Sequence, residues 1–216
     1  MSTRLRLAVL ASGGGTNLQS IIDHCRRADF PAEVVAVVSN KSEAYALRRA
    51  EQAGLPALSV PHRNFRSREE HEEEILRRLD PYRPELCVLA GYMRVVTPHL
   101  LEAFYDRKRK RPGVINIHPA DTRMYQGAHG YEFALGLLAE HPRRLSETKI
   151  TVHFVDSGVD TGPIILQAPV PVLPGDTLED LRERGLQVEH QLYPRAIRLL
   201  AEDKVRLEDG RVRLLE

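Results

Sequence analysis

Short apolar runs alternate with amphipathic segments along the first half of the chain. Continuous apolar residues predict buried strands at residues 5–11, 34–38, 58–60 and 86–90. Between these runs, apolar positions three or four residues apart predict helices beginning near residues 16, 44 and 69. Gly54 follows the second helix and predicts its C-terminal cap. This order predicts successive βαβ units.

The second half has a different pattern. Residues 114–117 and 150–155 predict strands, and Pro169 and Pro171 place the later part of 163–172 at a sheet edge or in extended loop. Thr177 can cap a long helix that reaches about residue 201, with interruptions expected near Gly185 and Pro194. Residues 205–207 and 212–214 predict a terminal β-hairpin.

These elements predict one α/β domain over residues 1–216, with a doubly wound, mostly parallel, Rossmann-like sheet flanked by helices and a C-terminal hairpin. Ligands of such sheets bind beyond the carboxyl ends of the strands. Unusual residues follow three predicted strands at 12–17, 91–94 and 116–118, which makes this edge the expected site.

Composition narrows the class of protein. The formal net charge of +1, with 42% hydrophobic and 28% charged residues, is typical of a globular chain that binds neither nucleic acid nor membranes. Residues 1–4 lack the pattern of a signal peptide, and Cys25 and Cys87 are expected to be buried free thiols. We therefore expect a cytoplasmic protein. The basic run at 107–111 is expected to be a solvated surface loop.

Three consecutive glycines join the first predicted strand to the first helix, in the segment 12–17. Backbone N–H groups of such a turn, together with the positive end of a helix, favour phosphate, although a tight turn alone can also require glycine. A nicotinamide fingerprint would need glycine where Leu18 stands, and a Walker loop would need Gly-Lys-Ser/Thr, which is missing. The turn therefore favours a small phosphorylated substrate.

A second group of residues suggests chemistry at a carbonyl. Asn116 and His118 lie two apart on a predicted strand, so their side chains point to the same side. An amide can donate to an oxyanion, and a protonated histidine can donate or act as a general acid. Asp160, in the loop 156–163, is the carboxylate expected to keep His118 charged. Taken alone, a histidine such as His118 is more often structural than functional, and an aspartate before Thr-Gly-Pro, as at Asp160, usually forms a turn.

The combination resembles the folate-dependent formyltransferase family, and within it the phosphoribosylglycinamide formyltransferases. The segments that carry the resemblance are 12–17, 90–94, 116–119, 152–155 and 159–167, in that order along residues 5–200. The resemblance implies catalysis by Asn116, His118 and Asp160. It also implies an acceptor phosphate on Gly15, Thr16 and Asn17, and Glu189 at the glycinamide end.

The resemblance further implies 10-formyltetrahydrofolate as co-substrate, no metal, and a monomer or homodimer. The folate would contact Arg68, Met93, Arg94, Val95, Val96 and the loop from Asp156 to Asp160. Without the family, Glu189 and Arg68 read as surface residues of helices, and the apolar side chains after residue 92 read as core. The implied reaction is formyl transfer to the amine of 5'-phosphoribosylglycinamide, in purine biosynthesis.

The chain departs from the family pattern after Pro119. Residues 120–127 read Ala-Asp-Thr-Arg-Met-Tyr-Gln-Gly, which brings Asp121 and Arg123 near the site, and the basic stretch 107–111 resembles an insertion. Three alternatives stay open: a formyltetrahydrofolate hydrolase, an amino-sugar formyltransferase, and a catalytically silent module that binds folate or a nucleotide. The hydrolases and the transfer-RNA formyltransferases would usually need a further domain, for which we expect no room.

Overall fold

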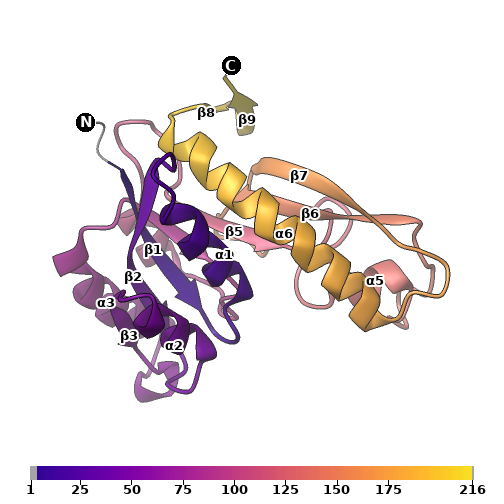
Figure 1. Cartoon of the computed structure of the whole chain (residues 1–216), viewed down its shortest axis with the longest axis horizontal. Coiled ribbons are helices and arrows are strands. Elements are labelled where there is room, and N and C mark those ends of the chain that lie inside the picture. The colour runs from indigo at the N-terminus through magenta and orange to yellow at the C-terminus, as the bar shows by residue number, and fades with distance from the viewer. Residues whose placement is uncertain (1–3, 216) are drawn as a thin grey trace.

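The central feature of the computed structural model, which describes residues 4–215, is a seven-stranded sheet (Figure 1). Its order is β3-β2-β1-β4-β5-β6-β7, parallel from β3 to β5 and antiparallel for β6 and β7. The strands are β1 (Leu5–Ala11), β2 (Ala32–Ser39), β3 (Ala57–Ser59), β4 (Leu86–Leu89), β5 (Val114–His118), β6 (Glu147–Phe154) and β7 (Ile164–Pro171). The predicted mostly parallel α/β sheet is confirmed, with the proline-containing strand at its edge.

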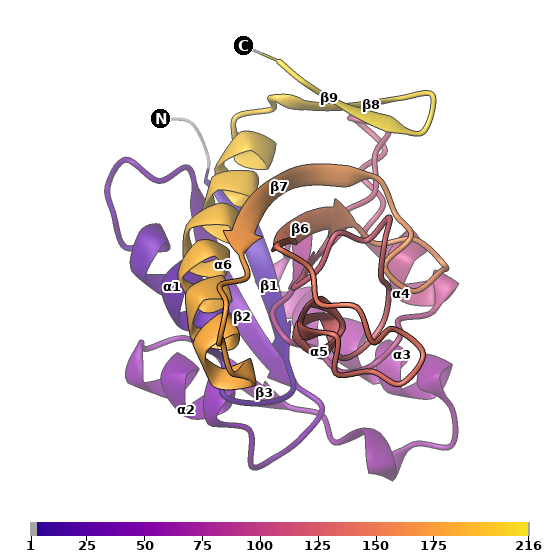
Figure 2. The ribbon, with the colours of Figure 1, turned by 90° about the vertical axis from the view of Figure 1, so that its right-hand side faces the viewer.

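Helices cover both faces of the sheet (Figure 2). The helices are α1 (Thr16–Cys25), α2 (Tyr45–Gln52), α3 (Arg68–Leu79), α4 (Pro98–Ala103), α5 (Gly130–Leu135) and α6 (Leu178–Ala201), with 3-10 turns at His62–Asn64 and Asp80–Tyr82. Leu7 and Val9 of β1 pack in one cluster with residues of α1, α2, α5 and α6. Ala8 and Leu10 pack in the other, with α3 and α4. A strand buried on both sides needs the continuous apolar run seen in the sequence.

Helix α6 runs unbroken for 24 residues, so the interruptions expected near Gly185 and Pro194 are wrong. Proline removes the hydrogen bond to the carbonyl four residues earlier. That carbonyl, of His190, instead accepts a 2.7 Å bond from the Ser20 hydroxyl of α1. A Cβ at Gly185 would lie 2.1 Å from the Tyr131 hydroxyl, so glycine there permits close packing. The predicted cap at Thr177 is confirmed, with a reciprocal bond to Asp180.

The terminal β-hairpin is confirmed as β8 (Val205–Glu208) and β9 (Arg211–Leu214), and both cysteines are buried and free. Helices α4 and α5 were not predicted, because six residues are too few to show a clear helical repeat. Within residues 4–215, no helix is both long and apolar enough to cross a membrane. The N-terminal residues 1–3, on which the expected lack of a signal peptide partly rests, lie outside the described residues.

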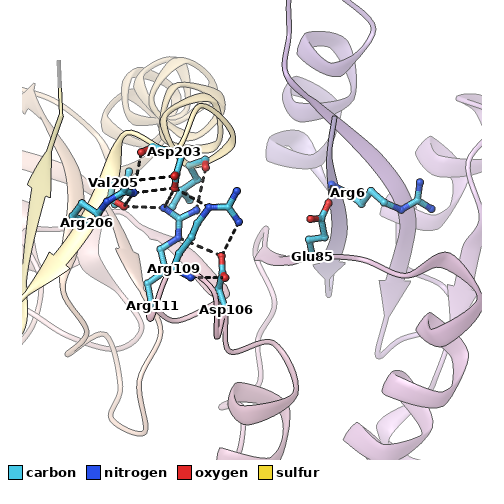
Figure 3. Close-up of polar contacts among 9 residues, drawn as sticks. Arg6, Glu85, Asp106, Arg109, Arg111, Asp203, Val205 and Arg206 are labelled. Carbon is cyan, nitrogen blue, oxygen red and sulfur yellow. Dashed lines mark hydrogen bonds and ion pairs between the residues drawn. The ribbon is translucent and has the colours of Figure 1, made fainter. Parts of the chain in front are cut away.

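The basic run 107–111 is not simply a solvated loop, so that expectation needs correction (Figure 3). Arg111 is 3% exposed and donates to the carbonyls of Leu200 and Val205, at 3.1 and 2.9 Å. Arg109 forms ion pairs with Asp106 at 3.0 Å and with Asp203 at 2.7 Å. The two arginines therefore fasten the hairpin and the end of α6 to the segment before β5.

We expect Arg111→Leu to lower the free energy of unfolding by about 2–4 kcal/mol, because two buried carbonyls each lose a bond from a charged donor. Urea unfolding followed by circular dichroism measures this change. Arg107→Leu is the control, since that arginine is exposed, and its effect should stay within about 0.5 kcal/mol. Equal stability of the two variants would contradict the assigned role of Arg111.

Candidate active site

The candidate site lies at the carboxyl end of β5, beside the antiparallel strand β6. Asn116 and His118 are two apart on β5 and therefore point to the same side of the sheet. Across the ladder, Asn116 pairs with His153 and His118 pairs with Thr151. Because paired residues share a face, the four side chains form one polar row at this edge.

Asp160 reaches this row from the loop between β6 and β7. Its Oδ2 lies 3.3 Å from Nδ1 of His118, and its Oδ1 accepts a 3.2 Å bond from the Asn116 amide. The backbone N–H of Gly127 donates to Oδ2 at 2.9 Å. The three residues expected to meet are therefore together, although 44 positions separate Asn116 from Asp160.

The backbone at Asp160 is left-handed, with φ of +53°. Non-glycine residues rarely adopt this region, and aspartate is among those that tolerate it best. The expectation of a turn-forming aspartate and the catalytic reading are thus compatible. This turn conformation directs the Asp160 carboxylate towards Asn116 and His118 of β5. Strained backbone conformations of this kind are common at functional sites.

His153 is a member of this cluster that the sequence reasoning quoted in a motif without giving it a role. It is 1% exposed, and its Nε2 lies 3.4 Å both from Oδ1 of Asp160 and from the amide nitrogen of Asn116. Its Nδ1 faces the Phe154 carbonyl at 2.8 Å, so that nitrogen carries the proton. The signal that could have found it is the antiparallel register, which places His153 opposite Asn116.

Burial and charge act in opposite directions on the two titrating partners. Burial lowers the pKa of His118 and outweighs the raising effect of Asp160, so the expectation of a charged imidazole is not met. Burial would raise the pKa of Asp160, but the neighbouring His153 and His118 side chains and the bond from the Gly127 N–H hold it below its ordinary value. The pair at neutral pH is therefore an ionised Asp160 facing a mainly neutral His118.

His118 keeps one ring nitrogen free of hydrogen bonds. Nδ1 faces the Asp160 carboxylate and carries the proton of the neutral ring, while Nε2 is buried without a partner among residues 4–215. Buried polar atoms without partners are uncommon and call for an explanation. A lone pair at Nε2, beside a cavity, is a proton acceptor.

A cavity of about 480 Å³ opens beside this cluster and holds most of the predicted folate contacts. Its lining includes Asn116, His118, His153 and Asp160, and also Met93, Arg94, Val95, Val96, Asp156 and Val159. Met93 is 75% exposed, Val95 45% and Val159 47%, so apolar side chains stand open around one hollow. A volume of this size with apolar walls and a few polar groups is typical of a small-molecule site.

Two of the residues predicted to contact the folate, Arg68 and Asp156, are placed less favourably than the others. Arg68 begins α3, is exposed, and does not line the cavity. Asp156 lines it, but its Oδ1 already accepts bonds from the backbone N–H of Gly158 and the hydroxyl of Thr161, at 3.0 and 2.6 Å. Its carboxylate therefore shapes the loop that carries Asp160.

The glycine turn lies at the start of α1 and outside the cavity lining. Gly15 has a φ of +70°, and a Cβ there would come within 2.9 Å of the Ala46 side chain. Gly14 and Thr16 are exposed, so the turn is open to solvent at these two residues. Arg49 donates to the Gly14 carbonyl at 2.8 Å and so places a cation at the turn.

Glu189 is buried, which corrects its reading as a surface residue of a helix. It is 7% exposed and accepts bonds from the Asn17 amide at 2.6 Å and the Tyr131 hydroxyl at 2.8 Å. Burial raises its pKa, although both donors oppose the shift. Two of the residues implied for the acceptor, Asn17 and Glu189, are therefore in direct contact despite 172 positions between them.

Known proteins resemble this chain over most of its length. The model of the family described as formyl transferase matches residues 5–197. This chain belongs to the formyl transferase family. It is 39% identical to phosphoribosylglycinamide formyltransferase of Haemophilus influenzae over 95% of this chain and 91% of the relative. Against the enzyme of the same name from Escherichia coli, identity is 37%, over 95% and 92%.

Solved structures of formyl transferases have the same fold. Glycinamide ribonucleotide transformylase 1 from Symbiobacterium toebii superposes with a TM-score of 0.90 at 45% identity, covering 99% of this chain and 95% of the other. The recognised family and the enzyme class of a formyl-transferring protein are therefore confirmed. Within residues 4–215 no cluster of three or more histidine, cysteine or acidic side chains could hold a metal ion.

Proposed function

We propose that this formyl transferase moves a formyl group from 10-formyltetrahydrofolate to the amine of 5'-phosphoribosylglycinamide, in the cytoplasm. The observation that carries the proposal is Nε2 of His118, which has no hydrogen-bond partner in the described part of the chain and lies at the wall of a 480 Å³ cavity. Asp160 faces the other ring nitrogen. Relatives named for this reaction match over nearly the whole chain, which supports the choice of acceptor.

The cavity has the surface expected for a formyl folate. Exposed Met93, Val95 and Val159 supply apolar contacts for a fused ring, and Arg94 supplies a cation for the folate carboxylates. The formyl carbon would then lie against the row of Asn116 and His118. Arg68 would contact the folate tail only beyond the cavity lining.

The N-terminal half of the domain would hold the acceptor, and the C-terminal half the catalytic loop and the folate. The open turn at the start of α1 favours the acceptor phosphate, because the first N–H groups of a helix lack partners within the helix. Arg49 adds positive charge there. Glu189 would bind the glycinamide end by exchanging its bond to Asn17 or Tyr131 for one to the substrate.

In the reaction, the amine attacks the formyl carbon while Nε2 of His118 accepts the proton that the amine loses. His118 then passes this proton to the departing folate nitrogen, and Asp160 stabilises the transient imidazolium. Asn116 donates to the oxyanion after releasing one of its bonds to Asp160 and His153. A neutral resting His118 suits this sequence, because the transferred proton comes from the substrate.

The test mixes the protein with 10-formyltetrahydrofolate and follows the folate absorbance, with and without phosphoribosylglycinamide. Formation of tetrahydrofolate that requires the acceptor is the expected result. Turnover without acceptor would instead indicate a hydrolase, and turnover only with an amino sugar would indicate an amino-sugar formyltransferase. Binding of folate with no turnover under any condition would overturn the proposal in favour of a silent binding module.

A further inference from the structure

A buried carboxylate attaches the loop of residues 119–128 to the sheet. This loop contains the segment 120–127, which departs from the family pattern. Asp121 has a side chain only 8% exposed, and its oxygens accept bonds from three donors on three segments. These are Lys149 of β6 at 2.9 Å, the Gln167 amide of β7 at 3.0 Å, and Arg123 of the loop itself at 3.1 Å. Burial would raise the pKa of Asp121, but these donors hold it far below its ordinary value.

Gln167 connects this cluster to the polar row of the site. Its amide nitrogen also donates to the Thr151 hydroxyl at 2.8 Å, and its oxygen accepts from Arg123 at 2.9 Å. Thr151 in turn donates to the Ala120 carbonyl at 2.6 Å. Thr151 pairs with His118 across the β5–β6 ladder. The hydrogen-bonded cluster around Asp121 therefore reaches the residue that lies opposite His118.

The far end of the same loop holds Asp160. Gly127 donates its backbone N–H to Oδ2, the same oxygen that faces Nδ1 of His118. Inside the loop, Met124 and Tyr125 donate their N–H groups to the Asp121 carbonyl, and Gln126 bonds back to Thr122. The chain from Asp121 to Gly127 is thus a compact turn with one end fixed on β6 and β7 and the other on Asp160.

We infer that Asp121, with Gln167, is a positioning residue for the reaction, which fixes the loop so that the Gly127 amide orients the Asp160 carboxylate towards His118. This inference rests on the proposed function. A displacement of about 1 Å at reacting groups can cost about 100-fold in rate. Loss of the attachment should therefore reduce catalysis without removing any group that contacts the substrates.

The test compares Asp121→Asn and Gln167→Met with the matched control Asp176→Asn. Asp176 is equally buried, with a side chain 6% exposed, and it is bonded to Arg184 at 2.7 Å and to the Leu173 backbone at 2.7 Å. Among residues 4–215, it forms no hydrogen bond or ion pair with the loop 119–128. We expect kcat to fall about tenfold or more in both test variants, with KM changed less than threefold, and to stay near the wild-type value in the control.

Hydrogen exchange of the Gly127 amide, measured by NMR, gives a second readout that does not require turnover. We expect its protection to fall at least about tenfold in Asp121→Asn while amides of β1 stay protected, because only the loop opens. Equal protection of Gly127 in wild type and both variants would overturn the inference. A parallel loss at Gly127 and in β1 would also overturn it, since it would indicate general destabilisation.

These outcomes separate the inference from the proposed function. If the wild-type protein transfers no formyl group, the proposed function fails, and the exchange experiment still decides whether Asp121 holds the loop against Asp160. If the wild type is active and the three variants match it, the positioning role fails alone.

Discussion

His118→Ala is expected to lower kcat for formyl transfer by about 10²–10³-fold, the usual cost of removing one group that stabilises developing charge. The variant loses the proton acceptor at Nε2 and the partner of Asp160. Single-turnover measurements with saturating folate and acceptor would report the chemical step directly. KM for both substrates should change less than kcat, because the imidazole acts mainly in the transition state.

The matched control for this variant is His99→Ala. His99 is a half-exposed histidine of α4 that pairs with Glu73 and does not line the cavity. Thermal unfolding of both variants would verify that each is folded, since His118 is 5% exposed. Near wild-type turnover by a folded His118→Ala protein would refute the proton-transfer role.

Asp160→Asn is expected to reduce kcat by about 100-fold or more and to move the acid limb of the pH profile to lower pH. Burial lowers the pKa of His118, and the charge of Asp160 partly opposes that effect, so neutralising Asp160 lowers the pKa further. Because neutral His118 is the active form in the proposed reaction, activity is lost as pH falls through this pKa. The loss should therefore begin at a lower pH in the variant.

The measurement is kcat/KM between about pH 4.5 and 9, which reports groups of the free enzyme. His153 also faces Asp160, so a His153→Gln variant should be titrated in parallel to assign the limb to His118. An acid limb that stays in place, or moves to higher pH, would contradict the assignment of Asp160 as the electrostatic partner of His118.

The main strands could be predicted because strands buried on both faces appear in the sequence as continuous apolar runs. Most helices could be predicted from apolar residues three or four positions apart. Leu7 to Leu10 of β1 contact a different layer at each alternate residue, so the run must be apolar throughout. Asn116, His118 and Asp160 could be predicted because the strands themselves could be predicted. The first two lie at the carboxyl end of a strand, and Asp160 lies in a loop between two strands. Their roles remain proposals, whereas their proximity follows from the structure.

The features that could not be predicted depend on contacts between residues far apart in the sequence, which local sequence patterns do not reveal. In helix α6, a hydroxyl of α1 bonds the carbonyl that Pro194 leaves without its helical donor. Arg111 is buried where it donates to two carbonyls of the C-terminal region. Glu189 and Asn17 meet across 172 residues. A single sequence without this pairing information favours the common reading of proline as a helix breaker and of charged residues as solvent-facing.

The bond from Ser20 to the carbonyl left free by Pro194 has an evolutionary consequence. A chain that lost the serine first would lose this bond to a part-buried oxygen, whereas one that lost the proline first would regain an ordinary helical bond. Substitution at the two positions should therefore be ordered in descent, with the proline replaced before the serine.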